Sequence, residues 1–247
     1  MNIDTINNLM FFHIPKNAGV SVINAFKMEK VKELHRSTVC GLDYEFIINN
    51  IDNTNQTKDW LLSLTKFTIV RNPYDRLVSL YHFRKKENDL YNLYRGANHD
   101  GGDKTTPDGE ELSFKEWVMD KRTMGVGFMW DDSFLEILKS FTKEKELYLW
   151  KNHHLQHEVL LEFINQIHFI TDSNYKLVVD DILRFENLDE DIKNFCRKYN
   201  LKEVMLPKKN TSPRKKNYID YYDDELIEFV SNIYADDLKF FNYKFGD

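Results

Sequence analysis

The sequence has few cysteines, prolines and glycines, and it has no long apolar run. Its 247 residues include 2 Cys, 5 Pro and 9 Gly. Cys40 and Cys196 are too few for a disulfide scaffold, which indicates a reducing compartment and two small buried side chains. The longest apolar runs, such as residues 9–12, are far shorter than the roughly 20 residues that cross a bilayer. Because the first residues also lack a basic stretch followed by an apolar one, we expect no signal peptide, no membrane span and a cytoplasmic location.

The sequence also lacks an excess of basic residues. Lys and Arg total 34 against 40 Asp and Glu, which gives a formal net charge of −6. A nucleic-acid-binding surface needs a broad basic face that displaces counterions from phosphates, so we expect no nucleic-acid partner. With 42% hydrophobic residues the chain has enough apolar surface for a core, and its length predicts one domain over residues 1–247. A local anion site remains compatible with this charge balance.

Short apolar runs alternate with helix-like spacing along the chain. Residues 9–14 and 67–70 are predicted strands, and each is followed by a turn and a helix, at 20–28 and from Pro73 onward. Further helices are expected at 113–121, 133–165, 188–199 and 223–234, further strands at 167–171 and 177–185, and a strand or loop with helical pieces at 31–64. This alternation predicts an α/β fold with a central parallel sheet.

One polar stretch interrupts this pattern. Residues 95–113 hold four of the 9 glycines, at positions 96, 101, 102 and 109. A long loop of this composition is typical of a functional lid or a disordered insertion. We predict a flexible insertion that contributes to substrate specificity.

The segment with the clearest chemistry is residues 13–21, HIPKNAGVS. A predicted strand end, a loop with Lys16 and Gly19, and a helix start together favour anion binding, because backbone N–H groups point outward there. The Asn17 amide and the Ser21 hydroxyl add donors. The spacing is not that of the nucleoside triphosphatase loop, G-x-x-x-x-G-K-[ST]. A lysine-containing turn without a ligand is the alternative interpretation.

A second segment, residues 71–81, has the sequence RNPYDRLVSLY. Arg71 follows a predicted strand at the carboxyl edge of the sheet, where ligands of open α/β sheets bind. Ser79 lies about two turns into the next helix. An arginine fork and a hydroxyl suit a phosphate. The alternative is that Arg71 and Arg76 pair with Asp75 or with surface carboxylates.

Together these two segments resemble Golgi-type carbohydrate sulfotransferases and their bacterial relatives. Residues 13–21 are similar to the family's H-[IV]-P-K-T-A-G-T-S segment, and residues 71–81 to its R-[ND]-P-[WY]-D-R-L-x-S-x-Y segment. Residues 181–188 resemble the strand that precedes the family's late helix, and residues 221–243 resemble its closing helix and tail. The resemblance implies a P-loop-like three-layer α/β fold with a central, mainly parallel sheet flanked by helices.

The resemblance also implies a reaction. The donor would be 3′-phosphoadenosine 5′-phosphosulfate, released as adenosine 3′,5′-bisphosphate, and the acceptor a hydroxyl of a carbohydrate or small molecule, with no metal. Lys16 would stabilise the leaving group. The 5′-phosphosulfate would contact Lys16, Asn17, Ala18, Gly19, Val20 and Ser21. Arg71 and Ser79 would hold the 3′-phosphate. Asn17 and Val20 replace two threonines of the family segment, and Val20 has no hydroxyl to donate.

Three further positions take predicted roles from the resemblance. His35 occupies the place of a histidine that follows the first helix in relatives, which makes it the candidate general base, with a surface histidine as the alternative. Ser212 and Arg214 lie in a basic run where the loop of relatives closes over the nucleotide, and are candidate contacts to the 3′-phosphate or the acceptor. His13 and Glu186 are interpreted as supporting residues.

The spacing of His153 and His157 suits zinc, but no third ligand accompanies them. We interpret them as a solvated helix face.

The sequence therefore predicts a sulfotransferase, with two other classes left open. One is a P-loop kinase that uses ATP, against which the missing triphosphatase spacing counts. The other is a catalytically inactive glycan-binding module on the same fold. Val20 favours that alternative, whereas Lys16, His35, Arg71 and Ser79 count against it. These motifs specify neither the acceptor nor the oligomeric state.

Overall fold

The protein is described from a computed structural model, which covers residues 2–30, 41–50, 55–86, 113–119, 165–207, 214 and 217–247. The chain forms two compact units. The first consists of Met1–Asn72, Asn165–Thr211 and Lys239–Tyr243, and the second of Pro73–Ile164, Ser212–Leu238 and Lys244–Asp247. The expectation of one domain over residues 1–247 stays a prediction.

The first unit contains a five-stranded sheet in the order β3-β1-β2-β4-β5. Its strands are β1 (Asn2–Asp4), β2 (Leu9–Phe12), β3 (Glu29–Lys30), β4 (Thr65–Val70) and β5 (Asp181–Arg184). Strand β4 pairs in parallel with both β2 and β5, whereas β1 pairs antiparallel with β2 and β3. The unit is thus a mixed α/β structure whose parallel part, β2, β4 and β5, contains three of the four predicted strands.

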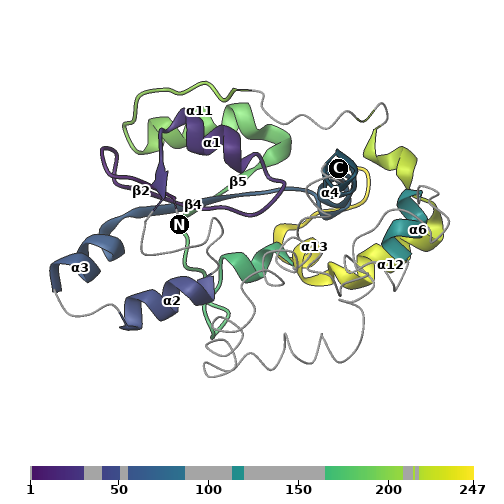
Figure 1. Ribbon diagram of the computed structural model, residues 1–247, viewed down its shortest axis with the longest axis horizontal. Coiled ribbons are helices and arrows are strands. Elements are labelled where there is room, and N and C mark those ends of the chain that lie inside the picture. The colour runs from purple at the N-terminus through teal and green to yellow at the C-terminus, as the bar shows by residue number, and fades with distance from the viewer. Residues whose placement is uncertain are drawn as a thin grey trace, which may run out of the picture. The chain divides into compact units, whose positions relative to one another are not determined.

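Helices cover both faces of this sheet (Figure 1). Helices α1 (Gly19–Ala25) and α11 (Leu188–Lys198) lie on one face, where they share a buried apolar cluster with the strands. That cluster includes Leu9, Phe11, Phe67, Ile69 and Leu183 of the strands, Val22 of α1, Phe26 just after it, and Ile192, Phe195 and Cys196 of α11. Helix α2 (Gly41–Asn50) lies on the other face, with the Tyr44 ring 5.6 Å from that of Phe12, and α3 (Asn55–Ser63) follows it.

The second unit is helical in its described part. It contains α4 (Pro73–Lys86), α6 (Phe114–Met119), the 3-10 helix η3 (Tyr218–Tyr221) and α12 (Asp224–Ile233), and α13 (Ala235–Phe241) begins in it. Pro73 is the first residue of α4, where its missing N–H costs no hydrogen bond. Asp223 caps α12 by accepting a hydrogen bond from the Leu226 N–H at 2.9 Å. None of the helices described in either unit is long and apolar enough to span a bilayer.

Two predicted strands needed correction. Most of the predicted strand at 167–171 is the 3-10 helix η1 (Gln166–Phe169), and only Thr171 makes a β-bridge, with Leu177. The predicted strand at 177–185 shortens to β5. A short apolar run shows only that a segment is buried, and it suits a buried turn of helix as well as a strand. The helices starting near residues 20, 73, 113, 188 and 223 are confirmed.

The remaining predicted elements lie largely outside the described residues. These are the insertion at 95–113, apart from Ser113, and the helical stretch at 133–165, apart from Asn165. The unpredicted strand β1 is too short, and too polar at Asn2 and Asp4, to show a strand pattern.

Tyr44 makes the stability of the first unit depend on pH in the alkaline range. Its side chain is buried between α2 and the sheet, and its hydroxyl finds no hydrogen-bond partner among the described residues. Burial, helped by the nearby Asp180 carboxylate, raises the pKa of Tyr44 from 10.0 to about 12. An unpaired buried hydroxyl of this kind costs stability.

We predict that Tyr44→Phe leaves stability at pH 7 unchanged or raises it by up to about 1 kcal/mol. In wild type the unfolded chain loses the Tyr44 proton from about pH 10, while the folded chain keeps it until about pH 12. The free energy of unfolding of wild type therefore falls between about pH 10 and pH 12, and that of Tyr44→Phe should fall less. Urea unfolding at pH 7, 9 and 10.5 measures the difference, and equal alkaline losses in both proteins would contradict it.

Candidate functional site

The loop between β2 and α1 carries the first predicted motif. Lys16 and Ala18 have φ angles of 71° and 58°, so two non-glycine residues on either side of Asn17 adopt the left-handed conformation. The carbonyl of Ala18 then accepts the first helical hydrogen bonds of α1, from Ser21 N–H at 2.9 Å and Val22 N–H at 3.2 Å. Each left-handed residue costs roughly 1 kcal/mol, so the surroundings have to hold this loop in place.

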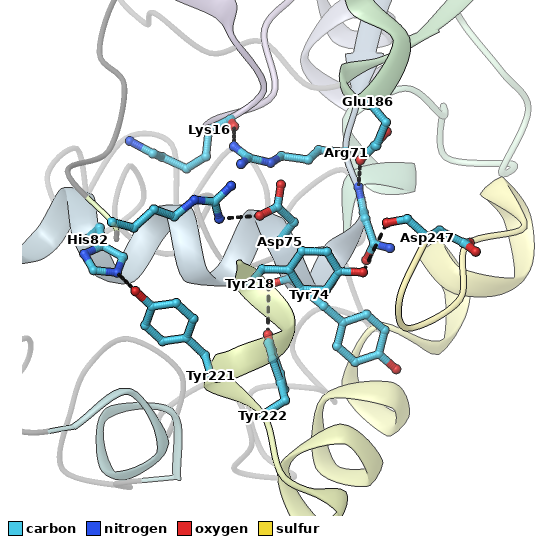
Figure 2. A network of polar contacts seen from close by, with 12 residues as sticks. Lys16, Arg71, Tyr74, Asp75, His82, Glu186, Tyr218, Tyr221, Tyr222 and Asp247 are labelled. Atoms are coloured by element: carbon cyan, nitrogen blue, oxygen red, sulfur yellow. Dashed lines mark hydrogen bonds and ion pairs between the residues drawn. The ribbon is translucent and has the colours of Figure 1, made fainter. Parts of the chain in front are cut away.

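Arg71, from the second predicted motif, contacts this loop directly. It follows the last residue of β4, and its Nη1 donates a hydrogen bond to the Lys16 carbonyl oxygen at 2.9 Å (Figure 2). Its guanidinium carbon lies 4.0 Å from the centroid of the Phe185 ring, a cation–π distance. Arg71, the first residue of the second motif, therefore contacts the loop of the first motif within the first unit.

Asn17 joins the loop to the sheet. It has no exposed surface, and its Nδ2 donates to the Ile69 carbonyl and to the Gln166 Oε1, both at 2.7 Å. Both amide hydrogens are thus used inside the fold, and a bond from this amide to a ligand would have to replace one of them. Among the described residues its Oδ1 has no hydrogen-bond partner.

Gln166 is a site residue that the sequence did not reveal. It is fully buried at the start of η1, its Oε1 accepts from the Arg71 N–H at 3.0 Å, and its Nε2 donates to the Arg71 carbonyl at 2.8 Å. A single glutamine between a predicted helix and a predicted strand carries no pattern from which this role is readable.

The His13 ring leaves no room for a side chain at Gly19. A Cβ on Gly19 would lie 2.0 Å from Cδ2 of the His13 ring, which itself stacks on Phe11 at 5.9 Å. The imidazole therefore rests against the first residue of α1, in agreement with the supporting role expected for His13.

Glu186 also supports the corner. Its Oε1 accepts a hydrogen bond from the Asn72 N–H at 2.6 Å, and its Oε2 accepts one from the Tyr243 hydroxyl at 2.8 Å. Figure 2 shows the Glu186 carboxylate close to the start of the Arg71 side chain. The structural role expected for Glu186 is confirmed by these two bonds.

The second unit holds two of the predicted site residues. Ser79 lies buried on α4, and Arg214 forms an ion pair with Asp75, in the first turn of the same helix. Tyr222 donates a hydrogen bond to the Tyr74 carbonyl at 2.9 Å, which joins the start of α4 to the segment just after η3 (Figure 2). The predicted contacts of Ser79 and Arg214 with a nucleotide stay predictions.

Several predicted residues lie outside the described part of the chain. They are His35, Ser212, His153 and His157, together with the rest of the basic run at 208–216 except Arg214. Among the residues that are described, no group of three or more His, Cys, Asp and Glu side chains gathers as a metal site would require.

The corner of the first unit combines a lysine loop with an arginine at the end of the neighbouring parallel strand. This arrangement places cationic residues at the carboxyl edge of an α/β sheet, where ligands of such sheets bind. The model of the sulfotransferase family matches residues 1–244, and the chain belongs to this family. The protein is therefore a transferase that acts on sulfuryl groups. No curated protein and no solved structure matches the chain significantly.

We predict that Gly19→Ala destabilises the protein by about 1–3 kcal/mol, because the new methyl group has to displace the His13 ring. His13→Ala removes that obstacle, so the double variant should lose less stability than the sum of the single variants. Urea unfolding of wild type, the two single variants and the double variant measures this difference.

A second glycine supplies the matched control. A Cβ on Gly41 would lie 2.0 Å from the Thr171 carbonyl oxygen. This oxygen belongs to the backbone, so no side-chain substitution removes it. Gly41→Ala should therefore be destabilising and strictly additive with His13→Ala. If the Gly19 pair is additive as well, the contact with His13 is not the reason for Gly19.

Proposed function

We propose that the protein transfers a sulfuryl group from 3′-phosphoadenosine 5′-phosphosulfate to a hydroxyl of a carbohydrate. The single observation that carries the proposal is the hydrogen bond of 2.9 Å from Arg71 Nη1 to the Lys16 carbonyl, which joins the two donor-binding motifs in a chain of the sulfotransferase family. The P-loop-like character of the β2–α1 loop is part of the same proposal.

In the proposed reaction the acceptor oxygen attacks sulfur in line with the bond to the bridging oxygen. That bond breaks, and adenosine 3′,5′-bisphosphate leaves with its electron pair. Lys16 Nζ interacts with the bridging oxygen and stabilises the negative charge that grows there in the transition state. The acceptor hydroxyl gives its proton to a base, for which His35 is the proposed residue. Positioning and electrostatics supply most of the catalysis in such transfers, as in phosphoryl transfer.

The donor's phosphates are assigned by the same motifs. Residues 16–21 contact the 5′-phosphosulfate, and because the Asn17 amide already donates twice within the fold, backbone N–H groups and the Ser21 hydroxyl carry most of this contact. In this proposal Arg71 and Ser79 bind the 3′-phosphate. Ser212 and Arg214 belong to the segment that closes over the nucleotide.

The preference for one nucleotide over another distinguishes the proposed sulfotransferase from a kinase. We predict that the wild-type protein binds adenosine 3′,5′-bisphosphate at least about tenfold more tightly than ADP with Mg²⁺, since each additional charged contact contributes roughly 1.5–3 kcal/mol. Isothermal titration calorimetry measures both affinities. In the Arg71→Ala variant, the affinity for adenosine 3′,5′-bisphosphate should be at least about tenfold lower than in wild type. Tighter binding of ADP would support the kinase and overturn the proposed donor.

Lys16 is expected to act on the rate more than on affinity. We predict that Lys16→Ala lowers turnover by about 10²–10³-fold, while donor affinity changes by less than about tenfold. Transfer from ³⁵S-labelled donor to a panel of mono- and oligosaccharides gives the rate, and Lys193→Ala, at an exposed lysine on α11, is the control. An unchanged rate would remove the leaving-group role. A protein that binds the bisphosphate and sulfates no acceptor would instead match the inactive glycan-binding module.

A further inference from the structure

The buried side chain of Gln166 connects Arg71 with the loop that contains Lys16. The amide of Gln166 accepts hydrogen bonds from the Arg71 N–H at 3.0 Å and from Asn17 Nδ2 at 2.7 Å, and it donates one to the Arg71 carbonyl at 2.8 Å. Gln166 has no exposed surface, and the reaction proposed above gives it no task.

The direction of these hydrogen bonds is fixed by the backbone. The Arg71 N–H can only donate and the Arg71 carbonyl can only accept, so the oxygen and nitrogen of the Gln166 amide have one possible orientation. The same oxygen faces Asn17, so Asn17 has to present its nitrogen. That nitrogen also donates to the Ile69 carbonyl at 2.7 Å, which agrees with this assignment.

The Gln166 amide also satisfies the backbone of the residue that follows β4. Strand β4 pairs with β5 as far as Val70 and Arg184, and Arg71 is the first residue after β4. Gln166 takes both the N–H and the carbonyl of Arg71, as the backbone of a neighbouring strand would. It thereby sets the position from which the Arg71 side chain starts.

These contacts close into a ring. Arg71 Nη1 donates to the Lys16 carbonyl at 2.9 Å, Lys16 is joined by its peptide bond to Asn17, Asn17 is bonded to Gln166, and Gln166 is bonded to the Arg71 backbone. The two left-handed residues, Lys16 and Ala18, flank Asn17 within this ring. Such backbone conformations persist where the surrounding structure over-determines them.

We propose that Gln166 is a positioning residue that holds the Lys16 loop in register with Arg71 for binding of a nucleotide with two separated phosphates. The identity of that nucleotide rests on the proposed function. A ligand with both phosphates needs the loop and Arg71 at a fixed separation, whereas a ligand with one phosphate does not. Loss of Gln166 therefore uncouples the two contacts rather than weakening each one.

Gln166→Met tests this, because methionine has a similar volume and no amide. We expect its affinity for adenosine 3′,5′-bisphosphate to fall by about tenfold or more, and its affinities for adenosine 5′-monophosphate and adenosine 3′-monophosphate by no more than about threefold each. Calorimetry with the three nucleotides gives the comparison. General loosening of the fold would reduce all three affinities equally, and that result, or no loss at all, would overturn the proposal.

Thr68→Val is the matched control. Thr68 is fully buried in β4, and its hydroxyl donates to the Phe12 carbonyl at 2.8 Å, so this variant also removes a buried hydrogen bond between β4 and β2. It leaves the ring of Lys16, Asn17, Gln166 and Arg71 intact. We expect it to destabilise the protein while keeping the ratio of bisphosphate to monophosphate affinities at the wild-type value. A change of that ratio in Thr68→Val equal to that in Gln166→Met would count against the proposal.

A readout without any nucleotide separates this inference from the proposed donor. Hydrogen exchange followed by mass spectrometry reports the protection of peptides covering residues 13–22 and 70–72. We expect exchange there to become at least about tenfold faster in Gln166→Met but not in Thr68→Val, because only the first variant opens the ring. If wild type does not bind the bisphosphate, the proposed donor fails, and exchange alone decides the role of Gln166. Unchanged exchange in Gln166→Met would overturn that role.

Discussion

The parallel pairing of β2 with β4 is the constraint on which the candidate site depends. Phe12 pairs with Thr68, so the carboxyl ends of both strands reach the same edge of the sheet. The chain leaves β2 into the loop that contains Lys16 and leaves β4 at Arg71, and the hydrogen bond between these two residues follows from that register. A slip of one residue would turn every side chain of β4 to the opposite face and separate the two motifs.

This constraint explains how much of the site was predictable. The strands predicted at 9–14 and 67–70 from local apolar runs correspond to β2 and β4, with ends that differ by two residues. The rule that ligands lie at the carboxyl edge then brings Lys16 and Arg71 to the same edge. What could not be predicted depends on contacts between residues far apart in the sequence. Gln166 lies 95 positions from Arg71 and 149 from Asn17, and no local period marks a side chain whose partners are that distant.

The contact between Gly19 and the His13 ring could not be predicted from the sequence for a related reason. Both residues belong to the recognised motif, and a glycine at a helix start is ordinarily interpreted as freedom for the backbone or close approach of a ligand. The structure adds a neighbouring ring at 2.0 Å from the missing Cβ, a steric requirement that only coordinates show. A motif can thus fix which residues matter while leaving the physical reason for each of them open.

The chemistry of the Gln166 side chain suits a site for anions. A carboxylate at this position would also accept from the Arg71 N–H, but it could not donate to the Arg71 carbonyl, and it would place a negative charge beside a loop proposed to bind phosphate and sulfate. A neutral amide satisfies both backbone groups of Arg71 and adds no charge. Because these hydrogen bonds form on folding, the loop is ordered in the absence of a ligand, and binding of the proposed donor would cost less conformational entropy.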